Sequence, residues 1–178
     1  MNKLDIATAV AVTMTILAVY ALASIPFVPA WSVFLSWACF FHLDGGENRN
    51  QAYLATLQHI GTGIIAAWLS ALLVLNNPFK NELTSEWWAP VVIGLIIGAL
   101  SRLSVFTRFS ITPAIIYGYA GTFAFLSLPG TFNNEALLSF TFDNVLISLG
   151  LGLVCGTSAG YVNAVVVGWL SSLSLRQG

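Results

Sequence analysis

A polar stripe runs along one side of an otherwise apolar stretch at 52–75, and it holds residues suited to contacting a polar molecule. Gln58, His59 and Thr62 fall within about 100° of arc if the stretch is helical, because successive residues are about 100° apart. An imidazole can bind a solute or relay protons. The alternative for His59 is a neutral ring hydrogen-bonded to another helix, since apolar surroundings require every polar group to find a partner.

Three further residues extend this candidate pathway. Asn163 lies in a glycine-rich stretch, where its amide either joins two helices or contacts a polar solute. Trp37 and Tyr117 belong to two aromatic-rich stretches, at 30–43 and 111–128. Lipid-facing positions explain most such aromatics, but facing rings would instead form a narrow slot for flat, small, polar molecules.

Recognised catalytic and cofactor-binding patterns are missing from the sequence. It has no Walker loop, no dinucleotide-binding glycine pattern, no zinc-protease helix and no carboxylate pair inside an apolar stretch. Cys39 and Cys155 lie in apolar stretches without metal-binding spacing, so both are interpreted as small hydrophobic residues. We therefore expect no enzyme activity, no cofactor and no metal site.

The composition predicts that the elements carrying these residues lie in a bilayer. Charged residues make up 7% of the chain and apolar residues 57%, whereas soluble domains carry about 25% charge. Apolar runs of about 20 residues, the length that crosses a bilayer as a helix, recur along the chain. With a net charge of −1 and no basic run, nucleic acid is not an expected partner.

The chain divides into six apolar segments joined by short polar connections. We predict an all-α fold, a polytopic transmembrane helical bundle of about six helices in a single domain, residues 1–178. The second segment is short and the sixth is long, so either could be tilted, broken or re-entrant. The six segments are 6–24, 30–43, 52–75, 90–105, 111–128 and 145–173.

The basic residues predict the orientation. With six crossings, a cytoplasmic N-terminus leaves only Lys80 outside, and the positive-inside rule favours this arrangement. Both termini are therefore expected in the cytoplasm. The basic residues on the cytoplasmic side would be Lys3, Arg49, Arg102, Arg108 and Arg176.

Small residues at every fourth position predict close helix packing. The sixth segment includes Gly152, Gly156 and Gly160 in such a row, and the fourth has Gly94 and Gly98. Small residues let helix backbones approach closely in lipid, within one subunit or between subunits. Lining of a pore is the alternative, and we expect a homo-oligomer.

The six segments also suggest an inverted three-plus-three repeat, because three crossings reverse the orientation of the second half. Aligning the second segment with the fifth pairs Pro29 and Ala30 with Pro113 and Ala114. Proline near a helix start is common in any helix, so chance punctuation is the competing explanation.

The segments PAWSVFLSWACFFHLDGG, TPAIIYGYAGTFAF and LISLGLGLVCGTSAGYV carry a family resemblance. From about Val28 onward the chain resembles the uncharacterised YcdZ-like proteins of the bacterial inner membrane. It differs in the charged stretch from Glu47 to Asn50 and in the longer loop around Lys80. The resemblance implies a multi-pass bacterial inner-membrane protein and transfers no catalytic residues.

These observations together favour a channel or facilitative transporter for a small polar, uncharged solute. Its pathway would use Gln58, His59, Thr62, Asn163, Trp37 and Tyr117. The rival hypothesis is a non-transporting membrane scaffold or subunit that assembles through its glycine-rich helix faces. The expected partners are the lipid bilayer, the solute and further copies of the chain.

Overall fold

The computed structural model describes residues 3–79 and 82–175, and every regular element in these residues is helical. Lys80 and Arg176, which entered the orientation argument, lie outside the described residues. The helices are α1 (Lys3–Leu22), α2 (Ala30–His42), α3 (Arg49–Leu75), α4 (Glu82–Leu103), the 3₁₀ helix η1 (Thr107–Phe109), α5 (Thr112–Leu126), α6 (Asn134–Leu138) and α7 (Val145–Leu175).

Four helices are long and apolar enough to cross a membrane: α1, α3, α4 and α7. The short helices α2, with 13 residues, and α5, with 15, are only about 20 Å long at 1.5 Å per residue. Neither spans about 30 Å of hydrocarbon alone. The six predicted segments are all helical, but two of them are too short for a full helical crossing.

Prolines mark the starts of both short helices. Pro29 occupies the N-cap of α2 in an extended conformation, and Pro113 lies at the first turn of α5, where its missing N–H costs nothing. Pro90 behaves differently, because it lies inside α4. The predicted start at residue 90 was therefore wrong by eight residues. A membrane helix tolerates an interior proline where neighbouring groups satisfy the freed carbonyl.

The sixth segment is one continuous helix of 31 residues, α7, so it is not broken. The connection before it contains the short helix α6. The Asn133 side chain caps α6 by accepting a hydrogen bond from the Ala136 N–H at 2.8 Å.

The described residues form two compact units. Unit 1 contains residues up to Leu57 and from Leu151 onward, and unit 2 contains Gln58–Gly150. The boundaries fall inside α3 and α7, so each unit combines elements from both halves of the chain. Unit 1 holds α1, α2, the start of α3 and most of α7, whereas unit 2 holds the rest of α3 with α4, α5 and α6.

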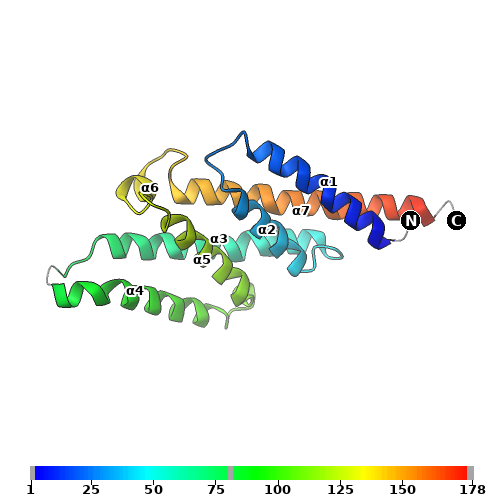
Figure 1. The fold of residues 1–178 in the computed structure, drawn as a ribbon. Coiled ribbons are helices and arrows are strands. Elements are labelled where there is room, and N and C mark those ends of the chain that lie inside the picture. The colour runs from blue at the N-terminus through cyan, green and yellow to red at the C-terminus, as the bar shows by residue number, and fades with distance from the viewer. Residues whose placement is uncertain (1–2, 80–81, 176–178) are drawn as a thin grey trace. The chain divides into compact units, whose positions relative to one another are not determined.

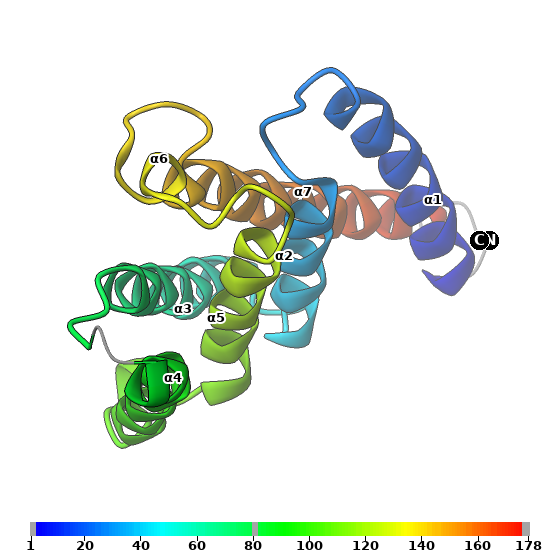
Figure 2. The same ribbon diagram turned by 60° about the vertical axis from the view of Figure 1, so that its left-hand side comes forward.

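Within each unit a short helix crosses a long one, α2 on α7 and α5 on α3 (Figures 1 and 2). In unit 1 the start of α1 and the end of α7 lie at the same end (Figure 1). The Arg49 guanidinium at the start of α3 lies 3.8 Å from where Gly168 of α7 would carry a Cβ. The chain has therefore returned by residue 49 to the end at which α1 begins, through the 23–29 connection and α2.

Candidate functional site

The contact between α2 and α7 organises unit 1. A Cβ at Gly156 would overlap the Val33 carbonyl oxygen, and one at Gly152 would overlap the Ser32 hydroxyl. A Cβ at Gly160 would lie 2.7 Å from the Phe40 ring. The three glycines therefore face α2 within one subunit, and they allow the two backbones to touch.

A long groove lies beside this contact, with a volume of about 840 Å³. One wall is the face of α1 that carries Ala7, Ala11 and Thr15 at every fourth position. Trp37 of α2 and Asn163 of α7, two of the residues predicted for the pathway, both line it. Both are also largely buried, at 7% and 4% exposure.

The charged groups that line this groove belong to the start of α1 and to the connection between α2 and α3. They are the ammonium of Lys3 and the carboxylates of Asp44 and Glu47. Asp44 has a positive φ of 67°, which turns the chain sharply after α2. The remaining lining residues are small, aromatic or aliphatic, apart from Thr15 and Asn163.

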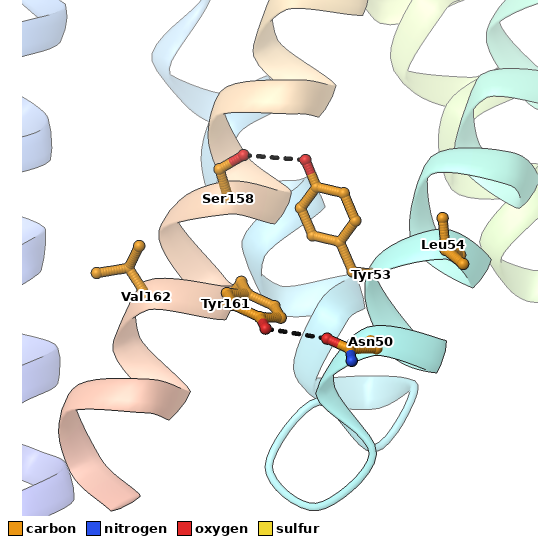
Figure 3. A pocket seen from close by; sticks show the side chains of 6 residues that line it. All are labelled: Asn50, Tyr53, Leu54, Ser158, Tyr161 and Val162. Carbon is orange, nitrogen blue, oxygen red and sulfur yellow. Dashed lines mark hydrogen bonds between the residues drawn. The ribbon is translucent and has the colours of Figure 1, made fainter. Parts of the chain in front are cut away.

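A second cavity of about 480 Å³ lies between the start of α3 and the middle of α7, and we call it the tyrosine pocket (Figure 3). The Tyr53 hydroxyl shares a hydrogen bond of 3.2 Å with the Ser158 hydroxyl. The Tyr161 hydroxyl donates to Asn50 Oδ1 at 2.9 Å. The two rings meet edge to face, with centroids 5.8 Å apart. Leu54 and Val162 complete the lining.

The mouth of the tyrosine pocket is charged. A smaller hollow of about 360 Å³, which shares Asn50 and Tyr161 with the pocket, is also lined by Glu47, Asn48, Arg49 and Gln51. The acidic and basic side chains occur there in equal number. The hollow therefore carries no net charge that would select an anion or a cation.

The other predicted pathway residues lie in unit 2, where Gln58, His59 and Thr62 contact residues of the same unit. Gln58 donates from Nε2 to the Arg108 carbonyl oxygen at 2.7 Å, and the Thr62 hydroxyl donates back to the Gln58 carbonyl oxygen at 2.7 Å. The buried His59 ring packs against Phe109 with centroids 6.4 Å apart. Tyr117 is 37% exposed.

Helix packing in unit 2 uses backbone contacts as well. A Cβ at Gly63 of α3 would overlap the Ile115 carbonyl oxygen, and one at Gly118 of α5 would overlap the Ile60 carbonyl oxygen. The row on α4 differs, because among the described residues no atom lies within 4 Å of a Cβ placed on Gly94 or Gly98. These two glycines do not pack inside the subunit.

Sequence reasoning missed the tyrosine pocket. Tyr53, Ser158 and Tyr161 were not singled out from the sequence, and Asn50 was placed in a charged stretch. A usable signal was the matched spacing of a short polar residue followed three positions later by tyrosine, Asn50–Tyr53 and Ser158–Tyr161. On two antiparallel helices this spacing lets each tyrosine reach the other helix's polar residue.

No group of three or more His, Cys, Asp or Glu side chains is positioned to hold a metal ion in the described part of the chain. Cys39 and Cys155 are both free thiols.

The all-helical fold, with four helices able to cross a bilayer, defines a polytopic α-helical membrane protein. Its cavities lie between apolar helices. The chain belongs to the family described as "Protein of unknown function (DUF1097)", whose model matches residues 6–171. No curated protein and no solved structure shows significant similarity to the chain.

Proposed function

We propose that this protein is a channel or facilitative transporter for a small, polar, uncharged solute, and that the solute moves along the groove of unit 1. The observation that carries the proposal is the lining of that groove. It joins charged side chains at the α2–α3 connection to a buried amide, Asn163, and an indole, Trp37, in the interior.

The distribution of charge selects the class of solute. Past Lys3, Asp44 and Glu47 the groove offers an ion no countercharge, so an ion would lose its hydration without compensation. A neutral solute can exchange water for the Asn163 amide, which both donates and accepts hydrogen bonds. The described residues that line the interior of the groove include no titratable group for proton coupling, which favours movement down the solute gradient.

We place this activity in the bacterial inner membrane with both termini in the cytoplasm. The basic residues of the chain and its resemblance to the YcdZ-like proteins support this location. Reporter fusions test it: a fusion at the C-terminus should give a cytoplasmic signal, and one in the 76–81 connection between α3 and α4 an external signal. The reverse pair of signals would contradict the orientation.

Solute uptake into proteoliposomes tests the activity itself. We expect the protein to raise the permeability to urea, acetamide or glycerol above that of empty liposomes, without raising permeability to sodium or chloride. Asn163→Leu should remove this increase and Asn163→Gln should retain part of it, because glutamine keeps the amide. Permeability no higher than that of empty liposomes for every solute would reject the proposal.

The second candidate function is a scaffold that assembles through α4. It is favoured by Gly94 and Gly98, which are open on a helix whose apolar stretch is only 11% buried. Cysteine crosslinking from Leu95, which is 71% exposed, would report such an interface. Crosslinked dimers in a protein that moves no solute would favour the scaffold.

A further inference from the structure

We infer that the tyrosine pocket binds a small uncharged molecule that combines a carboxamide with an apolar ring or short chain. The pocket and the groove share no lining residue. The inference therefore goes beyond the proposed transport and does not depend on it.

The lining of the pocket excludes charged ligands. Two phenols, one amide and one hydroxyl supply its polar groups, and among the described residues no Asp, Glu, Lys, Arg or His side chain lines it. A charged ligand would lose water there and gain no countercharge. The charged hollow at the mouth has Glu47 beside Arg49, so it does not reverse this preference.

The hydrogen bonds in the pocket determine what the ligand must offer. Tyr161 uses its single proton on Asn50 Oδ1, and the Asn50 Nδ2 group has two N–H donors that can reach a carbonyl oxygen. The paired hydroxyls of Tyr53 and Ser158 keep lone pairs that can accept from an N–H group. A carboxamide carries both complementary groups, a carbonyl oxygen and an N–H, on the same carbon atom.

The rest of the pocket suits an apolar body. Its volume of about 480 Å³ lies within the range of about 300–1,000 Å³ found for small-molecule sites. The two tyrosine rings present an edge and a face, which is the arrangement that aromatic partners prefer. Leu54 and Val162 add aliphatic surface from the two sides (Figure 3).

Equilibrium dialysis of the full chain in detergent with radiolabelled benzamide tests the inference. We expect saturable binding that benzoate does not compete for, because benzoate is charged. Tyr53→Phe and Ser158→Ala should each weaken binding by about threefold to tenfold, the cost of one hydrogen bond. Tyr161→Phe should also weaken binding, because Asn50 loses the hydrogen bond that holds its amide in place. Tyr20→Phe is the matched control, because Tyr20 on α1 is 80% exposed and lies outside the pocket. It should bind like the unmodified chain.

Three results would overturn the inference. The first is no saturable binding of benzamide. The second is equal affinity in all four variants, which would place the molecule elsewhere. The third is toluene competing as well as an unlabelled amide, which would show a pocket for acyl chains of lipid or detergent.

If Tyr161→Phe does not fold, Tyr53→Phe and Ser158→Ala test the other hydrogen-bonded pair. If the protein moves no solute into proteoliposomes but still binds benzamide, the transport proposal is rejected and this inference stands.

Discussion

The two units share one type of helix contact, in which a glycine of a long helix meets a backbone carbonyl of a short helix. In unit 1 the short helix α2 touches α7 where Gly156 meets the Val33 carbonyl. In unit 2 the short helix α5 touches α3 where Gly63 meets the Ile115 carbonyl. Each short helix thus lies on the long last helix of the other half of the chain, because α2 and α3 belong to the first half and α5 and α7 to the second.

The units differ in what surrounds that contact. Unit 2 fills the space with a cluster of Ala67, Leu100, Ile115 and Tyr119, against which Phe109 and Phe123 pack. Unit 1 has a smaller cluster of Phe40, Ala52 and Ala164, and the groove and the tyrosine pocket lie beside it. Unit 1 therefore keeps open space beside its helix contact, where the transport proposal places the solute, whereas the same region of unit 2 is filled by packed side chains.

The largest effect is expected at the two contacts between a glycine and a backbone carbonyl. Gly63→Ala and Gly156→Ala each place a methyl group on a backbone carbonyl, which a rotamer change cannot relieve. Overpacking costs about 1–3 kcal/mol and at times more, so both variants should show a clearly lower Tm in detergent. A normal Tm for either variant would mean that its helix contact is looser than described.

A smaller effect is expected where the neighbour is a side chain. Gly160→Ala meets the Phe40 ring at 2.7 Å, and a ring can shift where a carbonyl cannot. Its loss of Tm should therefore be smaller than that of Gly156→Ala. The two glycines lie about one turn apart on the same helix and receive the same substitution. An equal loss would show that the ring is held as rigidly as the backbone.

The buried hydrogen bond of unit 2 provides a third test of the comparison. Ser70 and Tyr119 are both buried, and their hydroxyls lie 2.9 Å apart. Tyr119→Phe should lower the stability by about 0.5–1.5 kcal/mol without changing solute flux. A change in flux at unchanged stability would assign solute contact to unit 2 as well.

The smallest effect is expected on α4. A methyl group added by Gly94→Ala would point into open space. Alanine stabilises a helix by about 0.5–1 kcal/mol relative to glycine, so the stability of the monomer should rise slightly. If the variant instead reduces an oligomer seen by crosslinking at Leu95, the α4 face is an interface between subunits.

The sequence allowed the helical fold to be predicted, because long apolar runs with little charge leave few other structures in a bilayer. Helix ends were harder. Pro90 looked like a start, whereas the usable signal in the sequence was Asn81 before Glu82, a residue type common at N-caps followed by an acidic residue. The suggested alignment pairs Ala30 with Ala114. In the helix contacts, however, the Val33 carbonyl of α2 corresponds to the Ile115 carbonyl of α5, a pairing shifted by two residues. Contact register depends on which faces meet, and a single sequence does not specify this.

The candidate site was predicted in part. Trp37 and Asn163 line one groove, but Gln58, His59, Thr62 and Tyr117 belong to the other unit. The stretch that carries the polar stripe is helical, as its periodicity predicted. It could not show that Gln58 already bonds the Arg108 carbonyl, because that partner is 50 residues away.

A blocking substitution in the groove gives the most direct test of the central claim that solute moves through unit 1. Ala11 lines the groove, whereas Ala9 is exposed on the same helix and is not among the residues that line it. The measurement is uptake of urea, acetamide and glycerol into proteoliposomes that contain equal amounts of each variant. Ala11→Phe should abolish the uptake that the unmodified protein supports, and Ala9→Phe should leave it unchanged. Uptake that is the same in both variants and in the unmodified protein would show that the solute does not pass through this groove.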